Sequence, residues 1–548
     1  MLRPFNPFLR KSKIAPMLAF FAVLVSTLLI TSTYSTYSQT WDEAAHIACG
    51  MQWLSEGTYK YEALHPPLAR LATALIPFLA GTRSQDKADM MAEGNALINL
   101  HGDYTKNLTM SRLGIMPFFW LVCFVVYRFM RDAFGSWYGA TAVVLLAFCP
   151  PVLGNSALAT TDAPLMAMFT WSFLRLCRFV QKPTLTNAAL VGFVFALSAL
   201  TKFTELPFFL LAAVLLLVSV TVRTRRFPLP IRPLFLAISI VPPVLWAGYH
   251  FSYGPIFPWD SIPPRTVAKL NSLSTREREF FTVTPVPGHE FFRGLLTAGT
   301  NGTLGRPSYL LGQNYWGRRW YFFPVALLVK TPIALLLLCG TGVGAIALNK
   351  RLRRDTNSIA LLLGAGCPLL VGMAGNMNIG LRHVLPMFPF MAMLGALGAI
   401  QLGQMSRDRG ESARRAAVLL LIGFEIVSCL RATPDFLPYF NEAAASHADY
   451  FLVNSDLDWG QDLFRLEARL RQVHASSVAI SYNGDPHADL SGLPMHTALS
   501  GGDRPTGWIA ISEMNYKEQP ENFGWLAKYP YTLVGRSIRL YYLRPSHL

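Results

Sequence analysis

The stretch IAPMLAFFAVLVSTLLITSTYSTYSQTWDEAAH, residues 14–46, decides the fold. Its first half is an apolar run long enough to cross about 30 Å of hydrocarbon. Its end places two adjacent carboxylates, Asp42 and Glu43, where the chain leaves the membrane, and a helix would put His46 on the same face as Asp42. Carboxylates beside a bilayer are costly to desolvate and are commonly functional. The alternative, from this stretch alone, is that Thr40 or Asp42 caps a short helix.

Similar apolar runs recur along the chain. The 548 residues are 52% hydrophobic and have a mean hydropathy of +0.33, which is unlike an ordinary soluble protein. Runs of about 17 to 25 apolar residues, the length of a membrane-spanning helix, occupy the first four-fifths of the chain. We predict eleven spans, at about 14–32, 113–130, 137–154, 163–180, 185–200, 204–222, 233–250, 321–341, 358–374, 384–402 and 415–431. The first has no convincing cleavage site after it, which favours a retained anchor over a removed signal peptide.

Basic residues indicate the orientation of these spans. With the N-terminus in the cytoplasm, the inner segments hold twenty-one Lys and Arg residues, whereas the three short outer turns hold only Lys202 and Arg382. This distribution obeys the positive-inside rule. We therefore predict a multi-pass protein of the inner (plasma) membrane with a cytoplasmic N-terminus, and the net charge of +16 is no argument for binding nucleic acid.

The parts outside the membrane fall into three regions. Two long outer loops cover about 33–112 and 251–320, and the first contains LHPPLARLATALIPFLA, which predicts an interfacial amphipathic helix started by Pro66 or Pro67. After residue 431 the chain becomes polar, with strand-like runs at 477–481, 508–512, 531–534 and 538–543 and a helical stretch at about 459–473. We predict a transmembrane catalytic domain over 1–431 and a soluble extracytoplasmic α/β domain over 432–548.

Isolated charged residues stand at the outer ends of the predicted spans. Asp162 is the only acid between Ala133 and Leu200, and a cap of the next helix by Thr161 or Asp162 would also explain it. Lys202 could likewise form an ion pair with nearby Glu205. Lys330 lies within a predicted span, where a charge is costly unless it is paired or hydrated.

Several of these motifs occur together in one known family. They are the acidic pair, LHPPL in the same loop, TTDAP after the third span, a TK turn after the fifth, YWGRRWYFFPVALLVKTP, NIGLRHVLP and the tail YFNEAAASHADYFLVNSDLDWGQDL. Over about residues 40–460 the chain resembles the GT-C glycosyltransferases. It is most similar to phospholipid-carrier-dependent enzymes related to protein O-mannosyltransferases (family 39) and to lipid A aminoarabinose transferases.

The resemblance implies a fold and an activity. The fold would be an α-helical polytopic GT-C membrane protein of about eleven spans with a small C-terminal α/β domain. The activity would be transfer of a sugar, a hexose such as mannose, from a polyprenyl-phosphate donor to a glycan, lipid or protein acceptor on the periplasmic or lumenal side. The second outer loop has no mannosyltransferase-type repeat domain, so a protein acceptor is in doubt.

The resemblance also implies roles for individual residues. Asp42 and Glu43 match the family's functional acidic pair, and Asp162 matches a second acidic position more loosely. Displacement at an anomeric carbon with inversion needs a base for the acceptor proton. We assign that role to Asp42, with Glu43 or Asp162 orienting the acceptor or the sugar hydroxyls. His46 and His65 are assigned to acceptor or sugar binding.

The leaving phosphate needs positive charge at the membrane surface. Lys202, Arg382 and His383 stand at the right level, with Arg318 and Arg319 as further candidates. For each of them the alternative is a contact with lipid headgroups.

No cofactor is required by this chemistry, and no metal ligand is assigned. A divalent metal held by Asp42, Glu43, His46 and His65 stays possible, since these include hard ligands. Two other functions stay open: a polytopic lipid or sugar-lipid flippase, and a nucleotide-sugar enzyme that uses Asp456 and Asp458 as a metal-binding DxD motif.

Overall fold

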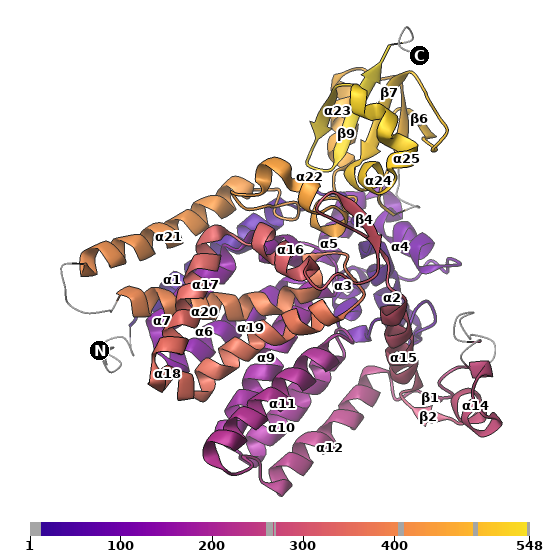
Figure 1. Ribbon diagram of the computed structural model, residues 1–548. Helices are drawn as coiled ribbons and strands as arrows, with labels where there is room; N and C mark the ends of the chain where they lie inside the picture. Colours follow the sequence, from indigo (N-terminus) through magenta and orange to yellow (C-terminus); the bar gives the residue numbers. More distant parts are fainter. Residues whose placement is uncertain (1–11, 259–266, 268–269, 404–409, 486–491, 545–548) are drawn as a thin grey trace.

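The structure is a computed structural model that describes residues 12–258, 267, 270–403, 410–485 and 492–544. A long helical bundle carries a small sheet domain at one end (Figure 1). The bundle consists of α1 (Ile14–Ser32), α6 (Met116–Ala133), α7 (Ser136–Ala147), α8 (Pro150–Ser156), α9 (Asp162–Gln181), α10 (Leu185–Ala199), α11 (Glu205–Thr224), α12 (Ile231–Gly248), α16 (Phe322–Lys330), α17 (Ile333–Leu348), α18 (Lys350–Arg354), α19 (Thr356–Ala374), η4 (Leu381–Met387), α20 (Phe388–Gly403) and α21 (Glu411–Ala432).

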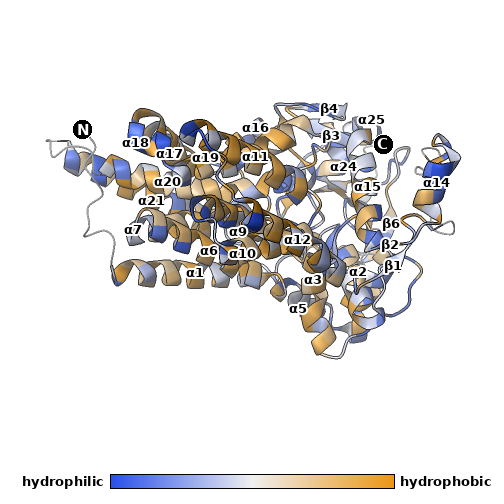
Figure 2. Cartoon of the chain, turned by 90° about the horizontal axis from the view of Figure 1, so that it is seen from below, coloured by the Kyte–Doolittle hydropathy of each residue, from blue (hydrophilic) through white to orange (hydrophobic). Residues whose placement is uncertain are grey.

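Every predicted span coincides with one or more of these helices. Within the described residues, six helices are long and apolar enough to cross a membrane, or up to eight if each of two bent pairs is one span. The segments α9, α10 and α21 are not among them, so the count of eleven stays a prediction. Apolar residues cover the length of the bundle in Figure 2, and many on α1, α11 and α12 are exposed, as expected of surfaces that face lipid.

Two predicted spans are broken, which the apolar runs did not reveal. The pair α7 and α8 bends by 68°, and α16 and α17 bend by 115°. Pro150 and Pro151 begin α8 and have no backbone N–H to continue the preceding helix. At the second break, Pro332 follows Thr331, which takes the extended conformation that a residue before proline prefers. The spans predicted at 137–154 and 321–341 therefore each consist of two helices, and whether each pair crosses the membrane as one span stays a prediction.

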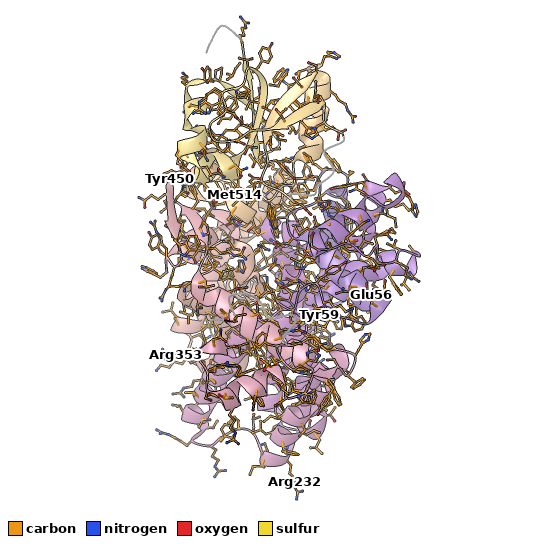
Figure 3. All side chains as sticks on the ribbon, turned by 90° about the vertical axis from the view of Figure 1, so that its right-hand side faces the viewer. Glu56, Tyr59, Arg232, Arg353, Tyr450 and Met514 are labelled. Carbon is orange, nitrogen blue, oxygen red and sulfur yellow. The ribbon has the colours of Figure 1, made fainter. Side chains whose placement is uncertain are left out.

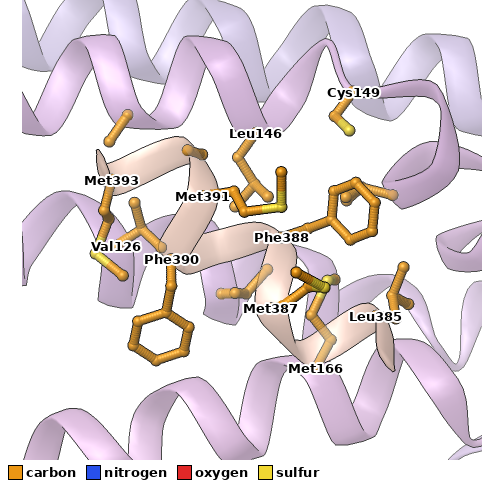
Figure 4. Close-up of a cluster of buried hydrophobic side chains, with 14 of the residues drawn as sticks. Val126, Leu146, Cys149, Met166, Leu385, Met387, Phe388, Phe390, Met391 and Met393 are labelled. Atoms are coloured by element: carbon orange, nitrogen blue, oxygen red, sulfur yellow. The ribbon is translucent and has the colours of Figure 1, made fainter. Parts of the chain in front are cut away.

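The core of the bundle is centred on α20. The span that contains α20 is 89% buried, whereas that of α12 is only 11% buried at the edge. Phe388, Phe390 and Met391 pack among residues of α6, α7 and α9 (Figure 4). Against α17, a Cβ added at Gly398 would lie 2.5 Å from the carbonyl oxygen of Leu338, so only glycine permits this close approach.

The two outer loops contain short elements. The first loop holds α2 (Glu43–Glu56), α3 (Pro67–Leu79), α4 (Met90–Ile98), η2 (Leu100–Gly102) and α5 (Tyr104–Leu113). The second holds β1 (Tyr253–Gly254), α14 (Thr275–Thr282), β2 (Val286–Pro287), α15 (His289–Leu304), β3 (Pro307–Leu310) and β4 (Gln313–Trp316). The predicted interfacial helix is α3, which begins at Pro67 as expected.

A five-stranded sheet forms the C-terminal region, in the order β6-β5-β7-β9-β8. Strands β5, β6 and β7 pair in parallel, whereas β9 pairs antiparallel with β7 and β8. The elements are η5 (Ala445–His447), α22 (Ala448–Phe451), η6 (Asn454–Asp456), α23 (Leu463–Gln472), β5 (Ser477–Ser481), β6 (Met495–Ala498), β7 (Gly507–Ser512), α24 (Glu513–Glu518), α25 (Pro520–Phe523), η7 (Gly524–Lys528), β8 (Tyr531–Val534) and β9 (Ile538–Leu543). The predicted strands and helix are present, and β6 was missed.

The first thirty residues after α21 belong to the bundle by their packing. Phe436, Phe440 and Leu457 lie in the same hydrophobic core as the membrane helices. The core beneath the sheet begins only at Leu463. Tyr450 and Met514 mark the junction between the two parts in Figure 3. The domain boundary at 432 thus stays a prediction, and the packing favours a later one.

Candidate active site

Asp42 lies at the start of α2 and forms an ion pair with a distant arginine. It occupies the N-cap position, but its side chain makes no capping hydrogen bond. Instead, Nη1 of Arg382 donates to Oδ2 of Asp42 at 2.7 Å. The capping interpretation of Asp42 was therefore wrong, because its carboxylate accepts no hydrogen bond from the backbone N–H groups at the start of α2.

Asp162 belongs to the same cluster. It is the first residue of α9 and is fully buried, and neither it nor Thr161 caps that helix through its side chain. Nζ of Lys202 donates to Asp162 Oδ1 at 2.6 Å, and Arg382 Nη1 donates to Oδ2 at 3.3 Å. Arg382 thus bridges the two carboxylates. The alternative pairing of Lys202 with Glu205 does not occur, because the Glu205 carboxylate accepts from Ser172 Oγ at 2.9 Å.

The four charged residues meet because four helix ends meet. Asp42 precedes α2, Asp162 begins α9, Lys202 lies between α10 and α11, and Arg382 lies in η4 after α19. We call these four residues the charge cluster. Each acid in the charge cluster is paired with a base, and the two negative and two positive charges sum to zero. Such pairing offsets the cost of removing the charges from water.

Two nitrogen atoms beside the charge cluster have no partner. Nε of Arg382 and Nε2 of His383 are buried and make no hydrogen bond in the structure. The Arg382 guanidinium also stacks on the Trp459 ring at 4.0 Å. Buried polar atoms without partners are costly, and at a charged site they are natural contacts for a ligand.

The charge cluster keeps Asp42 ionised. Burial alone would raise the pKa of Asp42, but the charge of the Arg382 guanidinium beside it outweighs that effect, so the pKa lies below its ordinary value. Asp42 is also the most accessible acid of the cluster, with 29% of its side chain exposed against none for Asp162. Of the two, only Asp42 has a carboxylate that is partly open to an incoming acceptor.

Glu43 points away from the charge cluster. It is fully buried and forms a two-pronged ion pair with Arg112, with both nitrogen–oxygen distances at 2.8 Å. The same carboxylate accepts from the backbone N–H groups of Thr40 and Ala159, each at 2.8 Å. Its expected role in orienting sugar hydroxyls stays a prediction, and these contacts favour a structural role.

His46 and His65 lie together beneath Asp42, with ring centroids 5.1 Å apart. Nε of Arg70 donates to Nδ1 of His46 at 3.3 Å, and Arg70 also forms an ion pair with Glu62. Burial, Arg70 and His65 all lower the pKa of His46, so its imidazole is neutral at neutral pH. Because Nδ1 accepts, the ring proton sits on Nε2 and can be donated. Arg70 was missed as a site residue, although a lone arginine within an apolar helix was a signal for it.

Arg318 and Arg319 lie between β4 and α16. Arg318 is exposed, whereas Arg319 stacks on Tyr315 at 4.2 Å and donates to Gln313 at 3.1 Å. Among the residues that the structure describes, neither forms an ion pair with the charge cluster. Their expected contact with donor phosphate stays a prediction.

The segment 454–461 forms a wall of the site. Nζ of Lys330 donates to the backbone carbonyls of Leu437 and Asp456, which explains how its charge is tolerated beside a membrane helix. The Asp456 carboxylate accepts from the backbone N–H of Leu381 at 3.0 Å, one residue before Arg382. Asp458 accepts from the N–H of Met514 at 2.9 Å. Both carboxylates of the DxD motif are thus bound to backbone.

No group of three or more His, Cys, Asp and Glu side chains is arranged to hold a metal ion within the described part of the chain.

Comparisons with known proteins concern the family of one segment and the fold of the chain. Residues 106–246 match the family model of dolichyl-phosphate-mannose-protein mannosyltransferases. The structure is similar to the S. cerevisiae protein O-mannosyltransferase Pmt1–Pmt2 complex bound to the sugar donor, with a TM-score of 0.53, 10% identity, and coverage of 78% of this chain and 91% of that one. The chain has the GT-C fold. With its apolar spans, this GT-C protein is an integral membrane protein.

Two further solved structures resemble this GT-C chain. ArnT from Cupriavidus metallidurans, bound to undecaprenyl phosphate, has a TM-score of 0.49 and 12% identity, with 95% of this chain and 97% of that chain covered. The oligosaccharyltransferase AglB from Archaeoglobus fulgidus, in complex with an inhibitory peptide and a dolichol-phosphate, has a TM-score of 0.49 and 13% identity, with 98% and 75% covered. Among curated proteins, none matches in sequence.

Proposed function

We propose that this protein is a membrane glycosyltransferase that moves a sugar from a polyprenyl-phosphate donor to an acceptor on the outer side of the membrane, with inversion at the anomeric carbon. The sugar is a hexose such as mannose. The match of residues 106–246 to a mannosyltransferase family and the GT-C fold both support this class of reaction. The acceptor is a glycan, a lipid or a protein.

The charge cluster carries the proposal. It combines an accessible ionised acid with a lysine and an arginine that a phosphate would attract, and it lies where helix ends reach the membrane surface. The unpartnered nitrogens of Arg382 and His383 add polar atoms beside it that are free to bind a ligand. A purely structural ion-pair network would satisfy such atoms internally.

The reaction then follows from the chemistry of the residues. The acceptor oxygen attacks the anomeric carbon as the bond from that carbon to the phosphate oxygen breaks, and the electron pair leaves with the phosphate. Asp42 takes the acceptor's proton as the new bond forms. Lys202, Arg382 and His383 stabilise the charge that grows on the leaving phosphate. Asp162 holds Lys202 and Arg382 in position through its two oxygens.

Arg382 has two tasks in this scheme. Without donor it is bonded to Asp42, and the bond blocks the base. A donor phosphate competes for the same guanidinium, so its arrival releases Asp42 for the acceptor. The neutral His46 supplies an N–H beside Asp42 for a sugar or acceptor hydroxyl, with His65 next to it.

Donor consumption tests the proposal. The purified protein in lipid nanodiscs is given short-chain polyprenyl-phosphate mannose and candidate acceptors, and release of polyprenyl phosphate is followed by mass spectrometry. We expect acceptor-dependent release by the wild type and none by Asp42→Asn. Movement of the donor between leaflets without its consumption would instead identify a flippase. Comparing periplasmic glycans in cells with and without the chain then identifies the acceptor.

A further inference from the structure

A second charged region lies at the other end of the bundle from the charge cluster. α9 runs from Asp162, in the charge cluster, to Gln181. Twenty helical residues span about 30 Å, so α9 is long enough for its two ends to lie on opposite sides of a bilayer, as the predicted span at 163–180 requires. Towards the far end, α6 and α9, with Asn187 of α10 and Asn357 of α19, line an open cavity of about 530 Å³.

The cavity is basic at one end. Its lining includes Arg128, Arg175, Arg178 and Lys182 but only one acid, Asp132. Asp132 is shared, because Arg128 and Arg178 approach the same oxygen at 3.7 and 3.5 Å while Arg131 pairs with the other at 2.7 Å. Among the described residues, Arg175 and Lys182 take part in no ion pair. The cavity therefore holds an excess of positive charge.

The other end of the cavity is apolar and opens to lipid. Leu121, Phe124, Trp171 and Leu174 line it one or two turns before the basic residues, on the side of the bilayer interior. The side chain of Phe124 is 61% exposed, on a helix that we treat as spanning the membrane. The cavity thus combines an apolar wall at acyl-chain depth with cations at headgroup depth.

We propose that this cavity binds one anionic phospholipid, with its phosphate among Arg128, Arg175 and Lys182 and an acyl chain along Phe124 and Trp171. Basic pockets between membrane helices are suited to binding lipid phosphates. The partial negative charge at a helix C-terminus is too small to neutralise several cations around one cavity, so an anionic ligand is favoured there. Positive charge scattered over a cytoplasmic surface needs no such pocket. Here two helices place the cations around one cavity, and a single acid is divided among three arginines.

Lipid retention tests the proposal without any enzyme assay. The protein is reconstituted in nanodiscs of phosphatidylglycerol and phosphatidylcholine, extracted into mild detergent and examined by native mass spectrometry. We expect one phosphatidylglycerol to be retained in preference to phosphatidylcholine. The double variant Arg128→Gln/Arg175→Gln should weaken retention about 25-fold, from a loss of about fivefold for each cation.

Two further variants serve as controls. Arg226→Gln removes an exposed arginine that does not line this cavity and should retain the lipid. Arg128→Lys/Arg175→Lys keeps the charge and should retain most of it, which separates lost charge from lost fold. Equal retention by the Gln double variant, or equal retention of phosphatidylcholine, overturns the proposal. Full displacement by inorganic phosphate overturns it as well, because the site would then recognise a free anion.

Discussion

At the scale of single residues, Asp42 is where the chemistry is expected to concentrate. We predict that Asp42→Asn lowers turnover about 10²-fold or more, since a neutral amide cannot accept the acceptor's proton. The amide oxygen can still accept from Arg382, so the variant should fold and insert normally. Turnover at saturating donor, with thermal stability measured in parallel, checks this. Unchanged turnover would exclude Asp42 as the base and leave Asp162, the other acid of the charge cluster, as the candidate.

Arg382 controls the pH range over which Asp42 is ionised. The pKa of Asp42 is below its ordinary value because the adjacent Arg382 guanidinium outweighs the effect of burial. A base with a lowered pKa stays active at more acidic pH, and activity is lost only as the pH falls through that pKa. Arg382→Gln removes the positive charge that lowers the pKa of Asp42, so burial should raise that pKa. The acid limb of the kcat/KM profile should therefore move to higher pH.

Arg382→Gln should also weaken binding of the donor phosphate. The variant Arg382→Lys keeps the positive charge but cannot bind two phosphate oxygens in one plane, so it should lower both kcat and the affinity for the donor. Arg226 lies in the loop after α11, remote from the site. The pH profile of Arg226→Gln therefore serves as the baseline. An acid limb that does not move in Arg382→Gln would mean that Asp42 is not the titrating base.

At the scale of elements, the two adjacent acids separate into two roles. Glu43 joins α2 to α5 through Arg112 and to the α8–α9 connection through Ala159. We predict that Glu43→Gln destabilises the protein by about 3–5 kcal/mol, because the amide nitrogen faces donors and leaves Arg112 without its countercharge. Thermal unfolding in detergent checks this against Asp42→Asn, which should be near wild type. A stable but inactive Glu43→Gln would restore its catalytic role.

The 454–461 segment positions η4 through one carboxylate. Asp456 accepts from the N–H of Leu381, and Lys330 holds Asp456 by its carbonyl. We predict that Asp456→Ala lowers kcat about tenfold by loosening Arg382, because a misplaced contact weakens the transition state. Asp456→Asn keeps a carbonyl acceptor and should stay near wild type. If Asp456 were a metal ligand, the Asn variant would fail too, and added chelator would abolish wild-type activity.

At the scale of the whole molecule, the topology makes a separate prediction. Eleven spans from a cytoplasmic N-terminus place the C-terminal sheet outside, on the side of the charge cluster. The packing agrees, because residues 454–461 line the charge cluster and lead directly into α23 and the sheet. A reporter enzyme that is active only outside the cytoplasm, fused after Leu548, should therefore be active. Activity of a cytoplasm-only reporter there would contradict both the span count and the proposed side of the reaction.

Much of the architecture could be predicted from local sequence. The predicted apolar runs coincide with every candidate membrane helix among the described residues, and the strand-like runs predicted four of the five strands of the sheet. The missed strand, β6, is short and exposed along its whole length, so no burial pattern marks it. The two breaks were hidden because α7–α8 and α16–α17 stay apolar through their bends, and hydropathy does not depend on backbone direction.

The sequence predicted several residues of the candidate site but not which of them contact one another. Sequence alone determined the membrane class, the orientation expected from basic residues, and the candidates Asp42, Asp162, Lys202 and Arg382. Only the tertiary structure decided that Asp42 rather than Glu43 faces the cluster, and that Arg382 bridges acids 340 and 220 residues away. Hydrophobicity and periodicity act over a few residues and can be read along the chain. Which helix ends meet is set by packing across the whole bundle, and that packing pairs the charges.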